Sequence, residues 1–243
     1  MQLEEFAEQI KPYVRKAVLE LYEAYAVTST NDWAWEHYER ARQRDVLNPS
    51  LFLAQVQRNG RGTQNRQWHS PEGSGVYCSM LYPVKDELFS KRHMRTGFTP
   101  IYTEIAGLAA WVVLTSAYPS LKNVLYIQGT NDLFAYHAKV GGILVETRLS
   151  ASGYLQGVVT GIGINLLKDH NLKILDGRNT AISLQDLLTP YEQTRLLTRK
   201  QMGYLVGICT VGLYDMMHEG VLLNYQPLLD LIRRPKPSLT STL

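Results

Sequence analysis

Long apolar runs and a strong excess of charge of one sign are both lacking in this chain of 243 residues. Because no run of about 18 apolar residues occurs, the sequence predicts no membrane-spanning helix and no membrane partner. The net charge of +3 is too small to indicate a nucleic-acid partner, which needs clustered positive charge. Glutamates at positions 4, 5 and 8 make the N-terminus unlike a signal or transit peptide.

Cysteine is also scarce, and the chain contains just Cys78 and Cys209. Both stand in apolar surroundings and lack the spacing of metal ligands, so we interpret them as packed thiols in a reducing compartment. This predicts a cytoplasmic protein. Apolar residues make up 45% of the chain, which is enough for a sizeable core in one large domain or in a domain with a small appendage.

Apolar residues spaced three and four apart predict the helices. These cover residues 2–25 with a break near Pro12, a segment from an N-cap at Thr30 or Asn31 to about Arg44, residues 98–118, a short helix after residues 180–185, and residues 199–218. Strands are predicted at about 51–57, 75–82, 123–128, 141–149 and 153–163. Because these elements do not alternate in a regular βαβ rhythm, we expect an α+β fold. Its sheet should be mixed and largely antiparallel, with helices packed mainly on one face and the site on the other.

A polar loop at residues 57–77 separates the first two buried strands. Its glycines allow close approach of a ligand to the backbone, its arginines offer forked donors for phosphate or carboxylate, and Trp68 offers a flat face for a ring such as adenine. A solvated basic hairpin loop has the same composition, so the pattern alone leaves both interpretations open. Since residues 58–67 are polar and glycine-rich, we expect them to be mobile without a ligand and to close over one.

Further along the chain, several motifs follow one another at defined spacing. They are Ser29-Thr30-Asn31; Gly60-Arg61-Gly62 followed by Arg66, Trp68, Ser70, Pro71 and Gly73; Asn131-Asp132 with Lys139 and Gly142-Ile143-Leu144-Val145-Glu146 behind it; and Gly161-Ile162-Gly163-Ile164-Asn165. Each has an ordinary structural interpretation, such as a helix N-cap for the first or a strand-end lysine for the third. In this order, between residues 27 and about 187, they resemble the catalytic domain of the biotin protein ligases. The Arg-Arg-x-Ser-Gly-Gly-Gly loop typical of the related lipoate ligases is absent.

The resemblance implies a fold of the class II synthetase and biotin ligase type, together with a ligase activity. Such an enzyme uses ATP and Mg²⁺ to convert biotin to biotinyl-5'-AMP. It then transfers biotin to a lysine on the biotin carboxyl carrier domain of a carboxylase, and it is a monomer or a homodimer. Because the biotin carboxylate itself attacks ATP, the lack of a Ser-His-Asp or Cys-His arrangement is no objection.

The site residues that the resemblance implies fall into three groups. The biotin-binding residues are Ser29, Thr30, Asn31, Gln57, Gly60, Arg61, Gly62, Thr63 and Lys139. The ATP-binding residues are Arg66, Trp68, Asn131, Asp132 and Asn165. Lys139, Asp132 and Arg66 are the catalytic residues, and Asp132 is also an indirect Mg²⁺ ligand. A lysine, an arginine and a metal ion suit a reaction that brings two anions together and expels pyrophosphate.

The expected domain organisation is an N-terminal helix at residues 1–26, a catalytic domain at 27–235 and a disordered tail at 236–243. The first segment is too short for a DNA-binding winged helix, and no C-terminal β-barrel domain is expected. Three departures from the family pattern bear on activity: this barrel is not expected, Gln128-Gly129-Thr130 replaces Lys-Trp-Pro, and Thr63 replaces an arginine. They leave open a noncatalytic binder of biotin or an acyl-adenylate, or a ligase for another small carboxylate of the lipoyl type.

Overall fold

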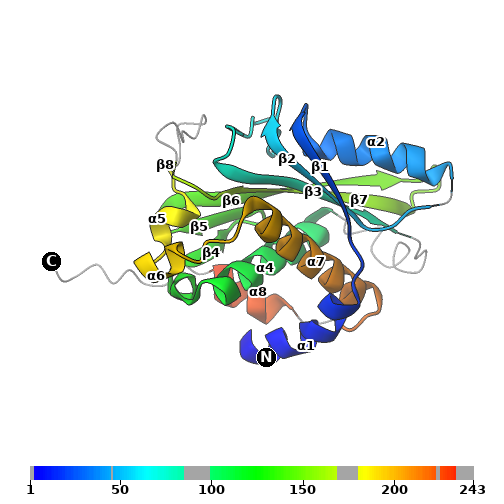
Figure 1. Cartoon of the computed structure of the whole chain (residues 1–243). Helices are drawn as coiled ribbons and strands as arrows, with labels where there is room; N and C mark the ends of the chain where they lie inside the picture. Colours follow the sequence, from blue (N-terminus) through cyan, green and yellow to red (C-terminus); the bar gives the residue numbers. More distant parts are fainter. Residues whose placement is uncertain (1–2, 45, 85–98, 169–179, 223–224, 234–243) are drawn as a thin grey trace.

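The computed structural model describes residues 3–44, 46–84, 99–168, 180–222 and 225–233, so the predicted tail at 236–243 lies outside the described residues. An eight-stranded sheet has the order β1-β2-β3-β7-β6-β5-β4, with β8 paired to β6 (Figure 1). The strands are β1 Glu20–Val27, β2 Ser50–Gln57, β3 Gly75–Pro83, β4 Leu125–Gln128, β5 Asp132–Ala135, β6 Ala138–Leu149, β7 Leu155–Asn165 and β8 Thr180–Ala181. β1 is parallel to β2 and β8 is parallel to β6, whereas the other neighbours are antiparallel. The prediction of a mixed, largely antiparallel sheet is confirmed.

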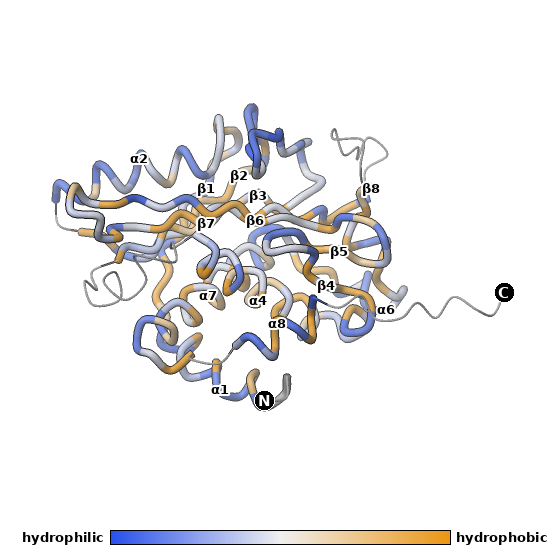
Figure 2. The backbone as a smooth tube through the Cα atoms, turned by 180° about the vertical axis from the view of Figure 1, so that it is seen from behind, coloured by the Kyte–Doolittle hydropathy of each residue, from blue (hydrophilic) through white to orange (hydrophobic). Residues whose placement is uncertain are grey.

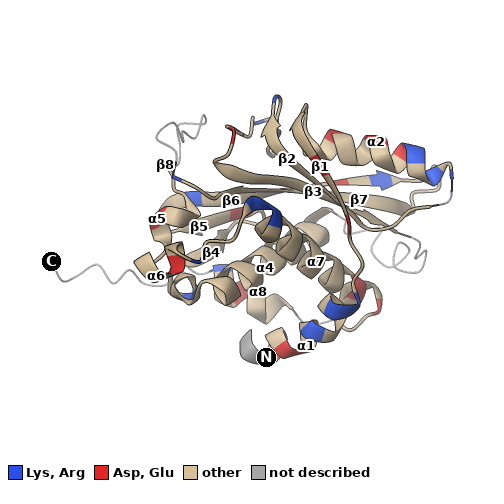
Figure 3. Cartoon of the chain, viewed as in Figure 1, with Lys and Arg blue, Asp and Glu red and all other residues tan. Residues whose placement is uncertain are grey.

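The helices form two unequal layers on this sheet (Figure 1). One face carries α1 (Leu3–Lys16), α4 (Thr99–Ala117), α7 (Arg199–His218) and α8 (Gln226–Arg233), and the other carries α2 (Thr30–Arg42). Short connecting helices are η1 Pro119–Asn123, α5 Leu184–Leu187 and α6 Pro190–Gln193. Acidic and basic side chains both occur along α2 (Figure 3). Because α2 is the one longer helix on its face and the other described long helices share the opposite face, helices pack mainly on one face, as predicted.

Alternating side chains along the central strands build two cores of different size. On β7, Val158, Ile162 and Ile164 belong to the large cluster shared with α4 and α7. Under α2 a smaller cluster contains Ala34, Tyr38, Phe52, Leu81 and Val159. Hydrophobic residues are frequent along the strands, whereas the loop after β2 is hydrophilic (Figure 2). The thinner cover on the α2 face leaves room for a cavity beside that helix.

Helix α4 is the most apolar of the long helices in the described part of the chain. By length and composition alone α4 could cross a membrane, but 61% of its apolar 18-residue stretch is buried inside the structure. It packs against α7 and β6 as a core helix does.

The predicted helix at residues 2–25 is wrong in its second half. α1 runs through Pro12 without the expected break and ends at Lys16, and the chain then forms β1 from Glu20. The aromatic and β-branched residues of this segment suit a strand, and pairing with β2 outweighs their helix-like spacing. The predicted boundary between residues 26 and 27 consequently falls inside a strand of the central sheet.

The predicted N-cap of α2 is also wrong. Ser29 occupies that position in an extended conformation and makes no side-chain capping bond, while Thr30 and Asn31 are the first helical residues. Their side chains are directed to other partners, described below. The short strand β5 was not predicted, since four residues between two turns carry too weak a pattern.

Candidate functional site

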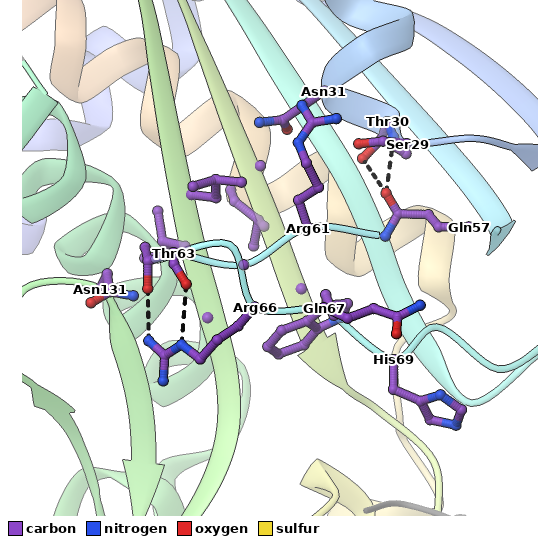
Figure 4. Close-up of a pocket in the computed structure, with 18 of the residues that line it drawn as sticks. Ser29, Thr30, Asn31, Gln57, Arg61, Thr63, Arg66, Gln67, His69 and Asn131 are labelled. Carbon is purple, nitrogen blue, oxygen red and sulfur yellow. Dashed lines mark hydrogen bonds between the residues drawn. The ribbon is translucent and has the colours of Figure 1, made fainter. Parts of the chain in front are cut away.

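A cavity of about 250 Å³ lies on the α2 face, between the loop after β2 and strands β6 and β7 (Figure 4). Every predicted site residue except Gly60 lines it. The further lining residues, which the predicted set omits, are Gln67, His69, Cys78, Gly142, Ile143, Leu144, Gly161, Ile162, Gly163 and Ala181. Gly60 belongs to the same loop, and its carbonyl accepts a hydrogen bond from the Trp68 amide at 2.8 Å. The tertiary structure thus brings four separated motifs together.

Glycines make the floor of the cavity smooth. Gly142 on β6 pairs with Gly163 on β7, and the indole of Trp68 lies against both. A Cβ atom at position 163 would stand 2.5 Å from Trp68 Cζ2 and 2.7 Å from its Nε1, and one at Gly161 would collide with Asn31 Oδ1. The alternation of glycine with large apolar residues along β7 is the sequence signal that identifies these positions.

Ser29, Thr30 and Asn31 are almost fully buried at one end of the cavity. The Gln57 side-chain oxygen accepts hydrogen bonds from the Thr30 amide at 2.9 Å and from the Thr30 hydroxyl at 3.0 Å (Figure 4). The Ser79 hydroxyl lies 2.7 Å from the Thr30 hydroxyl and 2.5 Å from the Asn31 side-chain oxygen, Oδ1. This end is a neutral network of hydroxyls and amides.

Two buried donors next to this cavity have no hydrogen-bond partner among the described residues: Asn31 Nδ2 and Trp68 Nε1. Leaving a buried donor unpaired costs roughly 1–3 kcal/mol, so native proteins keep few of them. Their position at the cavity indicates a site for a ligand that carries hydrogen-bond acceptors.

Residues 61–67 of the loop form a small hairpin over the cavity. Gln64 and Asn65 have φ of 57° and 58°, as in a type I′ turn, and the Arg66 amide donates to the Thr63 carbonyl at 3.2 Å. The Gly62 amide donates to the Arg66 carbonyl at 2.7 Å, and Arg61 bridges to Gln67. These contacts define one folded conformation of the loop, and its mobility without a ligand stays a prediction.

Arg66 folds back on Thr63 within this hairpin. Its Nε donates to the Thr63 carbonyl at 3.1 Å, and its Nη2 donates to the Thr63 hydroxyl at 2.8 Å (Figure 4). The residue that replaces the family arginine therefore holds the side chain of the arginine that is retained.

Lys139 and Asp132 form an ion pair at the other end of the cavity. Lys139 Nζ is 2.8 Å from Asp132 Oδ1, and the side chains are 14% and 16% exposed. The same oxygen accepts a hydrogen bond from Asn131 Nδ2 at 2.9 Å, and Lys139 Nζ lies 5.5 Å from the centre of the Trp68 ring. A mostly buried cation is therefore held beside a flat aromatic surface.

Asn165 holds the backbone at this end. Its Nδ2 donates to the Lys139 carbonyl at 3.1 Å and to the Ile182 carbonyl at 3.4 Å, and the Ile182 amide donates to the same Lys139 carbonyl at 3.0 Å. Since both protons of the Asn165 amide have partners, its side-chain oxygen is the atom left to accept from a ligand.

Two other kinds of site, a protein-bound metal ion and a cysteine nucleophile, find little support in the described residues. Within them, no group of three or more His, Cys, Asp or Glu side chains could hold a metal ion. Cys78 borders the cavity, but burial raises the pKa of its thiol to about 12, so it stays protonated and is a poor nucleophile. The arrangement instead suits binding of a polar, acidic ligand beside the indole of Trp68, a flat ring of about the size of a purine base.

Comparison with known proteins shows the family of the chain. The biotin/lipoate A/B protein ligase family matches residues 23–165, and the chain belongs to this family. The bifunctional ligase/repressor BirA of Salmonella typhimurium is 26% identical over 141 residues, and BirA of Bacillus subtilis is 29% identical over 122 residues. These matches cover 58% and 50% of this chain and 38% and 34% of the relatives, so the chain matches little more than a third of their length.

Solved structures share the fold. The biotin protein ligase of Leishmania major, in complex with biotin, has a TM-score of 0.65 at 20% identity and covers 93% of this chain and 84% of its own. The ligase of Aquifex aeolicus, in complex with biotin and ATP, has a TM-score of 0.60 at 20% identity, with 88% and 78% covered. A ligase-like protein of unknown function from a Silicibacter species has a TM-score of 0.58 at 10% identity, with 89% and 78% covered.

Proposed function

We propose that this protein is a biotin protein ligase, which forms biotinyl-5'-AMP from biotin and ATP and passes biotin to a lysine of a carboxylase carrier domain. The observation that supports it best is the shared cavity: a neutral polar network stands at one end and the Lys139–Asp132 pair at the other. That order matches biotin, which has an uncharged ureido ring at one end and a carboxylate at the other.

The ureido ring would lie against Ser29, Thr30 and Asn31. Such a ring has both donors and an acceptor, and the unpartnered Asn31 Nδ2 supplies a donor for its oxygen. Because this end of the cavity is buried and uncharged, it favours a neutral ring over an ion.

In the first step, an oxygen of the biotin carboxylate attacks the α-phosphorus of ATP, and the bond to pyrophosphate breaks with its electron pair. Two anions must approach each other, so a positioned cation lowers the barrier. Lys139 serves this role in the proposal, with Asp132 and Asn131 fixing the position of its ammonium group. Arg66, on the loop, is another cation that lines the cavity.

Magnesium would enter with the phosphates of ATP. Asp132 is a single carboxylate whose Oδ1 already contacts Lys139 and Asn131, which fits an indirect role better than a dedicated metal site. When bound, the ion would neutralise charge on the leaving pyrophosphate. In the second step, a neutral lysine amine of the carrier domain attacks the acyl carbon, loses a proton and releases AMP.

A noncatalytic binder is the second candidate, and the turn between β4 and β5 favours it. Gln128, Gly129 and Thr130 are all exposed there, and Gly129 has a φ of 65°. The positive charge and the rigid aromatic–proline pair of the family pattern are therefore missing beside Asn131 and Asp132. A ligase for another small carboxylate, such as a lipoyl-type acid, is the third.

Titration calorimetry combined with pyrophosphate release distinguishes these candidates. A ligase should bind biotin and release pyrophosphate when biotin, ATP and Mg²⁺ are all present. Biotin binding without pyrophosphate release would indicate the binder. No binding of biotin, together with pyrophosphate release in the presence of lipoate or octanoate, would indicate a changed substrate. Neither binding nor pyrophosphate release with any of the three acids would overturn the proposal.

The threonine at position 63 leads us to expect a ligase that releases part of its biotinyl-5'-AMP into solution. The resemblance places an arginine here, and a hydroxyl facing the adenylate phosphate lacks a charge-assisted hydrogen bond of roughly 1.5–3 kcal/mol when buried. The adenylate should thus escape about ten- to a hundredfold faster than from a protein with arginine at this position. We expect the wild type to biotinylate lysines of albumin in the presence of biotin and ATP.

The comparison for this experiment is Thr63→Arg. Because Thr63 also accepts from Arg66, Thr63→Ala serves as a control for loss of that contact. Labelling of a carrier domain by the wild type with no labelling of albumin would show that the adenylate is retained.

A further inference from the structure

Arg61 begins the hairpin that covers the cavity, and its guanidinium is already bound by two carboxylates from different elements. Nη1 is 2.5 Å from Asp32 Oδ1 on α2, and Nη2 is 2.9 Å from Glu146 Oε1 on β6. Partial burial works to lower the pKa of Arg61, but the hydrogen bonds to both carboxylates outweigh it, and the pKa is raised. The side chain therefore acts as a bridge between protein groups.

The Arg61 bridge is part of a network in which α2 and β6 also contact each other directly. Trp35 Nε1 donates to Glu146 Oε2 at 2.8 Å, so both oxygens of this carboxylate are held. Asp32 and Trp35 lie three residues apart on α2 and hence on neighbouring turns of one face. Arg148, also on β6, stacks over Trp35 with its guanidinium carbon 4.7 Å from the ring centre. These five residues are called the clasp below.

Both anchors of the clasp belong to rigid elements. α2 is fixed to the sheet by the fully buried Ala34 and by Tyr38, whose ring lies beside Trp35. On β6, Glu146 points to the same face as Gly142 and Leu144, which line the cavity. The clasp consequently connects the loop that covers the cavity to α2 and to β6, which forms part of the cavity floor.

We propose that Asp32 and Glu146 are positioning residues that hold the loop over the cavity through Arg61, without help from a ligand. Every contact in the clasp is made between protein groups, and neither carboxylate lines the cavity. The loop carries Arg66 and Trp68, so its position decides where these two side chains stand. Because the paired groups are about a third exposed, salt weakens the clasp. Access of ligands to the cavity then depends on ionic strength.

Hydrogen exchange of the ligand-free protein tests the clasp directly. In Asp32→Asn/Glu146→Gln, the hydrogen-bonded amides of Gly62, Arg66 and Trp68 should exchange about threefold to tenfold faster than in the wild type. The wild type in 1 M salt should approach the rate of the variant. Equal protection of these amides in wild type and variant, or no response of the wild type to salt, would overturn the proposal.

A matched control is available elsewhere on the sheet. Glu23→Gln removes a more exposed ion pair, in which Lys200 Nζ is 2.5 Å from Glu23 Oε2, and this pair lies away from the loop. The loop amides should exchange in this variant as they do in the wild type. Faster loop exchange here as well would mean that the effect comes from lost charge in general, and would count against the clasp.

The consequence for ligands rests on the proposed function. Stopped-flow dissociation of biotin should be about threefold to tenfold faster from the double variant, with the difference shrinking as salt rises. Equal dissociation rates would refute gating by the clasp. A wild type that does not bind biotin would refute the proposed function instead, while the exchange experiment would still decide the clasp.

Discussion

Lys139→Ala is expected to abolish formation of the adenylate while leaving the fold intact. The side chain projects into the cavity and pairs with Asp132, and its ammonium group contributes charge at the site instead of core packing. Losing one positioned donor or charge at a reacting centre typically raises the barrier by about 3–4 kcal/mol. Pyrophosphate release from biotin and ATP should therefore fall by about a hundred- to a thousandfold.

Two companion variants make this result specific. Lys168→Ala removes a lysine whose Nζ is 3.6 Å from Asp186 outside the cavity, and it should leave activity unchanged. Lys139→Ala/Asp132→Asn removes both charges of the pair. If the double variant regained activity, Lys139 would serve to neutralise Asp132, and its direct role in catalysis would be wrong.

Gly163→Ala is expected to lower adenylate formation by about a hundredfold with little loss of stability, since misplacing site groups by about an ångström can have an effect of that size. The new methyl group would stand 2.5 Å from Trp68 Cζ2, so the indole has to leave the floor of the cavity. Trp68 is half-buried and sits in a loop, and its ring can move without disturbing the sheet. The ligand would lose both the smooth floor and the aromatic surface.

Gly157→Ala provides the control for a methyl group on the same face of β7. Its Cβ would meet Tyr38 at 3.1 Å, outside the cavity. Both variants should unfold at similar temperatures, and Gly157→Ala should keep its activity. Full activity in Gly163→Ala would show that the position of Trp68 against the floor does not matter for the reaction.

Local pattern was sufficient for the elements whose sequence and environment agree. The helix predicted at residues 199–218 is α7 with the same bounds, because a long apolar pattern begins directly after the capping box of Thr198 and Gln201. β3 and β7 were likewise predicted close to their bounds, since both faces of β3 are buried and β7 alternates glycine with large apolar residues. Spacing of the motifs placed nearly all predicted site residues at one cavity.

Pattern failed where long-range partners decide the conformation. Residues 20–25 have helix-like spacing, but the open edge of β2 makes them a strand. Thr30 looks like a helix cap, yet its hydroxyl donates to Gln57, which lies 27 residues further along the chain. No local rule distinguishes these outcomes, because the partner lies far away in the sequence.

The sequence by itself determined the family, the mixed sheet and the set of side chains available to the site. The tertiary structure alone decided what those side chains do with one another. Arg61 was expected to bind ligand, and it bridges Asp32 and Glu146, which lie 29 and 85 residues away in the chain. Ion pairs of this kind depend on distances between elements, which a pattern along the chain does not contain.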